Sequence, residues 1–251
     1  MRPLGLELDR MFGDRKPMKL NAFLTHLHWD HVMGLPFFGP ALRPDTLLEV
    51  YGPPQEEGTL QEVMTHVVKP PFFPVHMHEL EGSMVFRELA DDKVVIGSTM
   101  VRSRMVPHVG TTLGFRIEAG GHSLAYISDH QAPEIGVSPQ KRGHVAEGVL
   151  ELCDGVDVLI HDGQYTKQEF ATVKGTWGHS TVDYAVHVAA EAGARRLVIF
   201  HHDPAHNDAE VDELLEIAMS SPGADRLDSV LAAEEGMTLD VGLLPTGLPG
   251  E

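Results

Sequence analysis

The sequence predicts a mixed α+β fold that is mostly β, with helices flanking the strands. Short stretches rich in Val, Ile, Thr and Phe alternate with amphipathic stretches of helical period, as in layered folds. Gly and Pro mark the turns between these stretches. Side chains that can bind a metal ion stand where predicted strands end, which is the usual place for a functional site. We expect a single domain over residues 1–251.

The first half of the chain is predicted to be rich in strands. A buried strand at 19–25 leads into a histidine-rich segment, and a short helix at 32–38 stops at a Gly-Pro pair. A second helix at 55–68 ends before two prolines, and a loop or edge strand interrupted by proline follows at 72–80. The remaining strands are expected at 46–51, 84–89, 93–106, 111–118 and 122–128.

The second half places longer helical stretches between buried strands. The stretch 181–192 is a strongly amphipathic helix, whose start Ser180 or Thr181 can cap and which Gly193 can end. The other helices are expected at 144–153, 164–172 and 208–220, and the strands at 156–161, 195–201 and 229–241.

The acidic charge of the chain bears on its partners. Nineteen basic residues against 37 acidic ones give a formal charge of −18. A protein that binds a long nucleic acid usually needs a basic track for the phosphates. The charge therefore argues against a polymeric nucleic acid and favours a small-molecule substrate.

The cysteine count and the hydropathy of the chain indicate the cellular compartment of the protein. Cys153 is the single cysteine, so an intrachain disulfide is impossible, which fits a reducing compartment. Residues 1–20 lack the apolar region of a signal peptide, and no apolar run is long enough to span a bilayer. We expect a cytoplasmic protein without a membrane partner.

Residues 25–31 read T-H-L-H-W-D-H and form the most informative motif of the chain. His26 and His28 are two residues apart at the end of a predicted strand, where such side chains point to the same side and can reach one metal. Asp30 and His31 follow directly. If a helix begins after His28, these two side chains face the position of a second metal ion. A nitrogen and oxygen ligand set without thiolate suits zinc, and also manganese or iron.

Four further groups of polar residues follow predicted strands. A single histidine at a strand end is more often a structural residue than a ligand, but together the groups can complete a dinuclear site. One metal would take His26, His28 and His108, the other Asp30, His31 and His201, with Asp129 between them. The four groups are His108, Asp129, His161-Asp162 and His201-His202-Asp203.

Three neighbouring side chains are candidates for the walls of the pocket. Trp29 lies inside the first motif, although packing against the next helix explains it equally well. His130 stands beside Asp129 and is as often structural as pocket-lining. His179 precedes the helix at 181–192, and its spacing alone indicates an ordinary loop histidine.

These motifs, in this order, resemble those of the metallo-β-lactamase superfamily, and in particular its phosphodiesterase branch, which includes RNase Z. The resemblance covers roughly residues 3–241. Besides the first motif, the segments that carry it are Pro107-His108 with 114–117, Ser128-Asp129, Ile160-His161-Asp162, and Gly178-His179-Ser180-Thr181 followed by a helix, a strand and His201.

The resemblance implies an αββα four-layer sandwich with two divalent metals, most simply zinc, at one edge of the β layers. The family pattern places the last ligand directly after four apolar strand residues, which is His201, and makes His202 a neighbour that points away. Only 25 residues precede His26, so the usual first N-terminal strands are expected to be missing. An unpaired sheet edge would then remain, which a homodimer could cover.

The resemblance also implies a mechanism, in which a hydroxide that bridges the two metals attacks phosphorus. His179 would give a proton to the leaving oxygen, and Asp162 would orient it. Asp30 joins these two as a catalytic candidate. We expect a phosphodiesterase for a small diester, with cyclic nucleotides first. The alternatives are a β-lactam, lactone or thioester hydrolase on the same scaffold, and an RNase Z-like endoribonuclease, which the missing basic arm disfavours.

Overall fold

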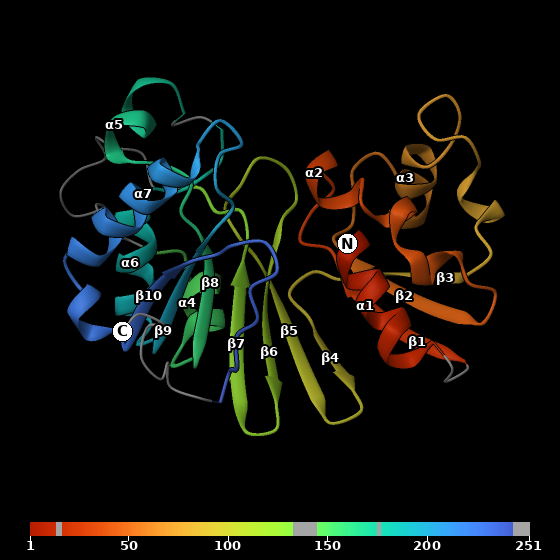
Figure 1. Cartoon of the computed structure of the whole chain (residues 1–251), viewed down its shortest axis with the longest axis horizontal. Helices are drawn as coiled ribbons and strands as arrows, with labels where there is room; N and C mark the ends of the chain where they lie inside the picture. Colours follow the sequence, from red (N-terminus) through yellow and green to blue (C-terminus); the bar gives the residue numbers. More distant parts are fainter. Residues whose placement is uncertain (14–16, 133–144, 175–176, 243–251) are drawn as a thin grey trace. The chain divides into compact units, whose positions relative to one another are not determined.

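The computed structural model describes residues 1–13, 17–132, 145–174 and 177–242. Its chain divides into two compact units, Met1–Ala90 and Asp91–Glu251, drawn in red to yellow and in yellow-green to blue (Figure 1). We describe each unit by itself. Whether they act as a single domain stays a prediction.

The first unit contains a three-stranded parallel sheet. The strands are β1 (Met18–Phe23), β2 (Thr46–Gly52) and β3 (Ser83–Glu88), in the order β1-β2-β3. Leu20 pairs with Leu48, and Val50 pairs with Phe86. Parallel neighbours need crossover connections, and short helices supply them here. All three strands were predicted to within two residues of these bounds.

The helices of this unit are shorter than predicted. The stretch 32–38 forms α2 (Trp29–Val32) and the 3₁₀ turn η1 (Leu35–Phe37), because Gly34 and Pro36 interrupt it. The helix α3 (Leu60–Val67) begins at Thr59, whose side chain and that of Glu62 form a capping box. The 3₁₀ turn η3 (Met77–Glu79) lies within the segment 72–80, and no strand forms in that segment.

An N-terminal helix, α1 (Arg2–Phe12), was not predicted. It packs on the 3₁₀ turn η2 (Gly39–Leu42), and Arg43 Nη1 donates to Asp9 Oδ1 at 2.9 Å. A side chain at Gly5 would come within 3.1 Å of the Gly39 nitrogen, so a glycine permits this close approach. Contacts with residues about thirty positions away hold this helix, and a local pattern search does not detect such contacts.

The core of the first unit forms where these elements meet. Val32 of α2 is fully buried, so it anchors the short helix that follows the histidine motif. Burial of a side chain of this kind stabilises a fold by roughly 1.5–3 kcal/mol. Its buried partners in this core are Leu35, Phe38, Ala41, Leu48, Val50, Leu60, Met64, Val68, Met77 and Leu80.

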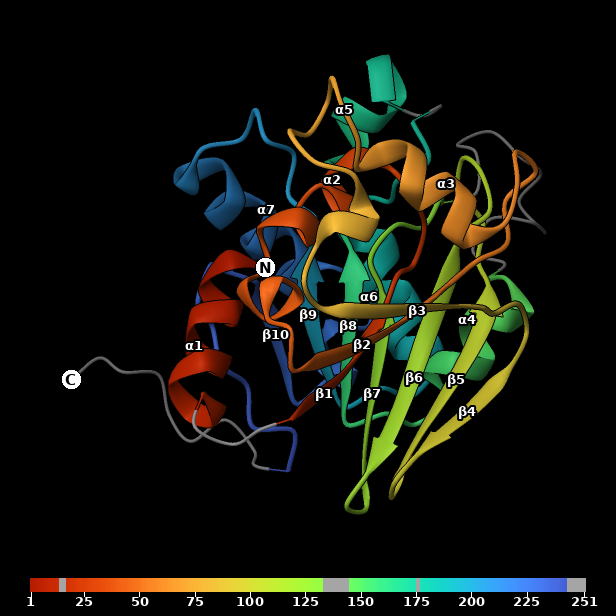
Figure 2. The ribbon, with the colours of Figure 1, turned by 90° about the vertical axis from the view of Figure 1, so that its right-hand side faces the viewer.

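The second unit contains a seven-stranded mixed sheet, whose strands can be followed in Figure 2. The order is β10-β9-β8-β7-β6-β5-β4; β4 to β7 are antiparallel, and β7 to β10 are parallel. The strands are β4 (Lys93–Ile96), β5 (Thr99–Met105), β6 (Leu113–Ala119), β7 (His122–Ile127), β8 (Val158–Asp162), β9 (Arg196–Phe200) and β10 (Ser229–Ala232).

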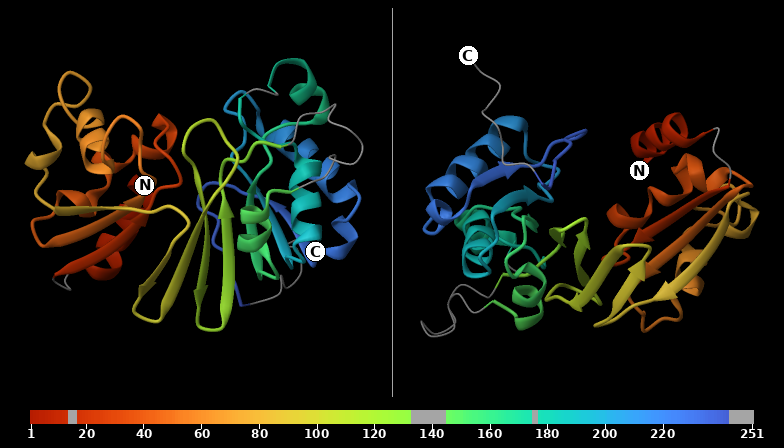
Figure 3. Two further views of the ribbon diagram at one scale, coloured as in Figure 1. Left: turned by 180° about the vertical axis from the view of Figure 1, so that it is seen from behind. Right: turned by 90° about the horizontal axis from the view of Figure 1, so that it is seen from below.

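Helices lie along one face of this sheet, as the cyan and blue ribbons of Figure 3 show. Alternate strand residues such as Ala125, Ile127, Leu159, Leu197 and Ile199 bury themselves against these helices in a single core. The helices are α4 (Glu147–Cys153), α6 (Val182–Glu191) and α7 (Asp208–Ser220). Three shorter elements belong to the same unit: α5 (Lys167–Glu169), the π turn η4 (Phe170–Lys174) and the 3₁₀ turn η5 (Ala224–Arg226).

The predicted elements of the second unit mostly agree with the structure. The helix 208–220 is observed at those bounds, whereas the strand predicted at 229–241 ends at Ala232. The predicted strand 93–106 is a hairpin, because Gly97 turns the chain with φ +60°. The predicted helix 144–153 starts at a residue that lies outside the described part of the chain. Of the described residues, none belongs to a helix long and apolar enough to cross a membrane.

The topology of the large sheet explains where its functional residues lie. β5 and β7 run in the same direction, because both are antiparallel to β6, and β8 and β9 are parallel to β7. The carboxyl ends of these four strands therefore share one edge. Asp162 ends β8, and the segments after the other three strands carry His108, Asp129 and His201, so strand direction brings these residues to the same edge of the sheet.

Candidate metal centre

The first group of ligand candidates lies in the segment after β1. The strand ends at Phe23, and the Leu24 nitrogen donates to the Tyr51 carbonyl at 2.8 Å, which holds the segment beside β2. His26 is buried, with 2% of its surface exposed, and its Nδ1 lies 3.1 Å from Thr25 Oγ1. His28 then serves as the N-cap of α2.

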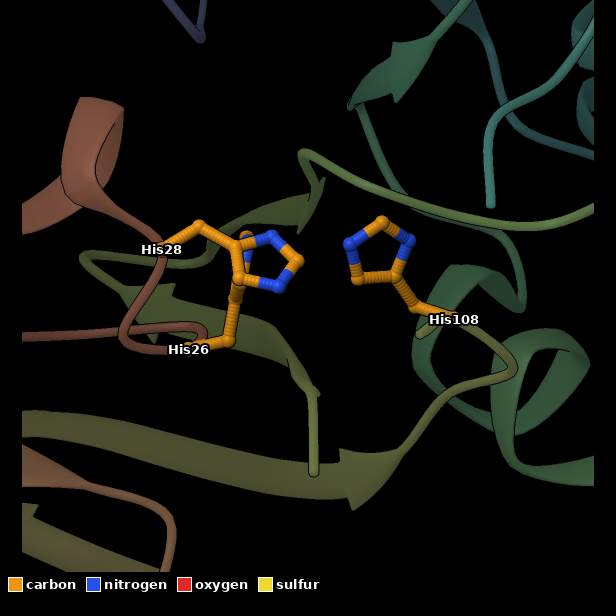
Figure 4. Close-up of side chains that lie close together, drawn as sticks. All are labelled: His26, His28 and His108. Atoms are coloured by element: carbon orange, nitrogen blue, oxygen red, sulfur yellow. The ribbon is translucent and has the colours of Figure 1, made fainter. Parts of the chain in front are cut away.

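The His26 and His28 rings turn toward each other, as Figure 4 shows. His26 Nε2 lies 2.9 Å from His28 Nδ1, and the two ring centroids are 4.4 Å apart. Two imidazole nitrogens this close can bind the same ion. His26 and His28 are two positions apart, and this spacing was predicted to direct both side chains to one metal ion. The observed geometry agrees with that prediction.

Asp30 and His31 lie in the single turn of α2. His31 Nε2 is 3.1 Å from Asp30 Oδ2, and the His31 ring centroid is 4.2 Å from that of His26. Asp30 is largely exposed, and His31 is mostly buried. Trp29 is 63% exposed and contacts the Phe72 ring edge-on, so it does not pack into the core of its unit.

The second group begins with His108, which lies in the segment between β5 and β6. Its Nδ1–H donates to the Gly178 carbonyl at 2.6 Å, so the other ring nitrogen, Nε2, is left as the candidate ligand atom. This Nε2 lies 3.9 Å from Asp129 Oδ1. Gly178 has φ +90°, and a Cβ on it would come within 2.5 Å of the His108 ring. Only glycine fits this position.

Asp129 lies at the centre of this group. It is 1% exposed, and three histidines surround its Oδ1. The distances from that oxygen are 3.3 Å to His201 Nε2, 3.9 Å to His108 Nε2 and 3.9 Å to His179 Nδ1. Asp129, His108 and His179 each offer one ligand atom, and these three atoms lie within 4.8 Å of one another.

His179 and Asp162 form a close pair. His179 Nδ1 donates to Asp162 Oδ2 at 2.9 Å, and the His179 ring stacks on that of His201 at 5.0 Å. Asp162 is completely buried, which raises the pKa of its carboxyl group, while the hydrogen bond from His179 opposes that rise. The backbone N–H groups of His130 and Gln164 also donate to this carboxylate.

His130 and His161 form a buried pair behind these residues. His161 Nδ1–H donates to the Asp162 carbonyl at 2.6 Å, so its Nε2 accepts from His130 Nδ1–H at 3.0 Å. Burial lowers the pKa of His161 to about 4, and burial and then the neighbouring His161 lower the pKa of His130 well below its usual value. His130 is 1% exposed and packs near Tyr184, so its ring lies in the interior and does not line an open pocket.

The structure separates His201 from His202. His201 Nε2 lies near Asp129, while His202 Nε2–H donates to the Ala233 carbonyl at 3.1 Å, beyond β10. Burial lowers the pKa of His202. His202 therefore contacts the segment after β10 and not the carboxylate at the centre of the group.

The motif search missed Gln164. This residue is 4% exposed, and its side-chain nitrogen lies 2.9 Å from His201 Nδ1 and 3.0 Å from the His201 carbonyl oxygen. A glutamine just after His161-Asp162 gives no chemical signal of its own. Only the fold reveals that it meets a residue 37 positions later.

The donor sets of both units fit divalent metal ions. They consist of imidazole nitrogens and carboxylate oxygens, which suit zinc, manganese or iron. Several of the histidines have their second ring nitrogen hydrogen-bonded to a backbone or side-chain group, which is common for histidines that bind metals. The two sheets with their helices, and donors at strand ends, define a candidate metal-binding protein of the mixed α+β class.

Comparison with known proteins identifies the family. The sequence profile of the beta-lactamase superfamily domain matches residues 15–202, and the chain belongs to this superfamily. A ribonuclease Z from Porphyromonas gingivalis is 26% identical over 258 residues, which cover 88% of this chain and 82% of the relative. The predicted family, with its ribonuclease Z-like branch, is confirmed.

Two solved structures show the same fold. The metallo-beta-lactamase fold protein YhfI from Bacillus subtilis is 18% identical, with a TM-score of 0.62 over 92% of this chain and 81% of that protein. Human tRNase Z, short form, is 20% identical, with a TM-score of 0.62 over 89% of this chain and 79% of that protein. The predicted fold class and the prediction of a metal-dependent hydrolase of phosphodiesters are confirmed.

One prediction was wrong. The acidic charge argued against a polymeric nucleic acid, but the curated relatives are ribonucleases. A net charge is a sum over the whole chain and does not describe the potential at one site. A cluster of ligands that holds cations can attract phosphates locally even when the remaining surface is acidic.

Proposed function

We propose that the two groups of ligands together hold two divalent metal ions, and that the protein hydrolyses phosphodiesters at this centre. His26, His28 and His108 would hold one ion, and Asp30, His31 and His201 would hold the other, with Asp129 shared between the two sets. Support comes from the order of these residues along the chain, which resembles the family pattern, and from the donor chemistry of each group. Zinc is the first candidate metal, and manganese and iron are the alternatives.

The observation that carries the proposal is the hydrogen bond between His179 and Asp162. Because Nδ1–H donates to a fully buried carboxylate at 2.9 Å, the ring is held in one orientation with Nε2 on its other side. A nearby carboxylate favours the protonated imidazole, which can then give its Nε2 proton to a leaving alkoxide. Hydrolysis of an activated ester with a good leaving group has less need of such an acid.

The remaining residues either bind the metal ions or hold His179 in position. Divalent ions bound by the ligands supply a water-derived nucleophile and neutralise charge on the phosphoryl oxygens. Asp162 orients His179, and the buried pair of His130 and His161 supports Asp162 from behind. Asp30, the most exposed of the carboxylates, lies beside His31, where it contributes negative charge to the second ion.

For the substrate, a cyclic nucleotide is one candidate, because it offers a single compact ribose phosphodiester to the metal centre. An RNA phosphodiester is the second candidate, and the ribonuclease Z relatives at 26% identity favour it. Both substrates share a ribose phosphodiester with an alkoxide leaving group, which is the chemistry that His179 serves.

A substrate panel on metal-reconstituted protein tests the proposal. Bis(p-nitrophenyl) phosphate, 3′,5′-cyclic nucleotides, a short RNA with a 3′ extension and the β-lactam nitrocefin are compared at matched concentration, with bound metal measured in each preparation. We expect turnover of the diesters, and a slower rate on nitrocefin. Hydrolysis of nitrocefin without hydrolysis of any diester would contradict the phosphodiesterase assignment.

A further inference from the structure

We propose that Gln164 is the positioning residue for the last metal ligand, His201. This inference rests on the proposed function, because it assigns a role within the same metal centre. It starts from the backbone of His201, which has φ +61° and is the only non-glycine residue with a left-handed φ in the part of the chain that the structure describes. Residues other than glycine adopt this conformation uncommonly, because the Cβ atom then crowds the backbone.

The left-handed backbone of His201 turns the chain directly after β9, which ends at Phe200. At this point the His201 side chain meets Asp129, while the next residue, His202, faces the Ala233 carbonyl. The last residue pair between β8 and β9 is Asp162 with Phe200, so the His201 carbonyl lies beyond the paired residues. The Gln164 amide donates to this carbonyl at 3.0 Å and thereby replaces the missing strand partner.

The same amide also contacts the ring of the ligand. Its nitrogen lies 2.9 Å from His201 Nδ1, on the side of the ring opposite Nε2, and Nε2 lies 3.3 Å from Asp129 Oδ1. Histidines that bind metals through one ring nitrogen usually have the other one held by a hydrogen bond, which fixes the direction of the ring. With the amide nitrogen facing Nδ1, this ring atom accepts and the proton is on Nε2. Metal binding through Nε2 would move the proton to Nδ1, and a half-turn of the amide would then present its oxygen to Nδ1–H.

Gln164 is itself held firmly. Its backbone N–H donates to Asp162 Oδ1 at 3.2 Å and to the Ser180 carbonyl at 3.1 Å, and its side chain is buried. One residue thus connects the carboxylate that orients His179 with the ligand that faces Asp129. A change in its side chain should alter metal binding more than it alters the fold.

Zinc binding by three variants tests the role. Gln164→Met keeps the length of the side chain but offers neither donor nor acceptor, and we expect about 10- to 100-fold weaker binding of one of the two ions. Gln164→Glu keeps an acceptor for Nδ1–H but cannot donate to the His201 carbonyl, and we expect a zinc affinity between those of the native protein and Gln164→Met. Gln168→Met, at an exposed position on α5, is the matched control and should bind zinc like the native protein.

Affinity is measured by competition with a chromophoric chelator, and melting of the metal-free proteins shows whether each variant folds. Native-like zinc binding in Gln164→Met overturns the inference. An equal loss in the Met and Glu variants also overturns it, because that pattern indicates packing and not contact with the ring. If the Met variant does not fold, Gln164→Leu takes its place. Failure of the native protein to hydrolyse any diester would remove the proposed function, whereas the zinc titration would still decide the role of Gln164.

Discussion

The Asp162 carboxylate illustrates how the site is built at the scale of single residues. It accepts hydrogen bonds from His179 Nδ1 and from the backbone nitrogens of His130 and Gln164, which belong to three separate segments. A fully buried carboxylate without such donors would be costly. The same hydrogen bonds therefore stabilise the charge and fix the position of the histidine.

His179→Ala tests the acid role at this scale. We expect turnover of diesters with an alkoxide leaving group to fall by about 10²–10⁴, because general-acid assistance has that magnitude, while the zinc content stays close to native. Steady-state rates and metal analysis are compared with those of His187→Ala, a histidine of α6 outside the site. Loss of bound zinc in the His179 variant would count against the assignment.

Gly178→Ala tests the contact between its loop and His108. The new methyl group would lie within 2.5 Å of the His108 ring, and the φ of +90° would be strained as well. We expect weaker zinc binding and a free energy of unfolding lower by about 1–3 kcal/mol. Gly155→Ala is the control, because Gly155 also has a positive φ but no atom within 4 Å of the place that a methyl group would take. Equal zinc binding by both variants would show that the clash at position 178 does not displace the His108 ring.

The buried His161 should make stability depend on pH. Its pKa is lowered to about 4 in the folded protein, whereas an unfolded histidine has a pKa of roughly 6.5. Between these values the unfolded state binds more protons, so the free energy of unfolding falls as the pH drops from 6.5 toward 4 and is fully retained above 6.5. Denaturant unfolding of the metal-free protein at several pH values should show a smaller fall in His161→Gln than in the native chain. An identical pH dependence in both would refute this assignment.

At the scale of elements, strand direction and helix capping explain most of the architecture. Alternating apolar residues and turn glycines predicted where the strands of both sheets lie, because these signals are local. The hairpin of β4 and β5 was expected as one stretch, 93–106, and β10 as the longer stretch 229–241. Helix ends were predicted less well where prolines and glycines break a helical stretch, as at Gly34 and Pro36. The helix α1 and the true start of α3 depend on contacts or caps that the apolar pattern does not reveal.

Asn207→Ala tests the best-defined cap. The Asn207 side chain accepts hydrogen bonds from the Ala209 and Glu210 nitrogens, and the Glu210 side chain accepts one from the Asn207 nitrogen. Loss of such a cap costs about 1 kcal/mol, so we expect the midpoint of urea unfolding to decrease with little change in slope. Ser220→Ala, at the exposed end of the same helix, should leave the midpoint nearly unchanged. Equal midpoints for the two variants would contradict the capping role.

At the scale of the whole molecule, the proposed centre takes ligands from both compact units, Met1–Ala90 and Asp91–Glu251. Each unit has its own sheet and its own buried core, so each can retain structure without metal. Metal ions that bind donors from both units would favour the folded state of both at once.

Metal removal tests this arrangement. We expect chelation to abolish diester hydrolysis and to lower the melting temperature, since a ligand at about 1,000 times its dissociation constant stabilises by roughly 4 kcal/mol. Calorimetry of the metal-free protein should show a broader or divided transition, and added zinc should restore a single one. A transition that does not respond to zinc would show that the two units do not share the ions.

By itself, the sequence determined the fold class and the family and led to the proposed donors, because these depend on local apolar patterns and on motifs of a few residues. Only the tertiary structure decided which other groups hold those donors. His108 meets the Gly178 carbonyl 70 positions away, and Gln164 meets His201 37 positions away. Contacts of this kind follow from how strands and loops are arranged in space, and neither residue type nor spacing along the chain encodes them in a form that can be read locally.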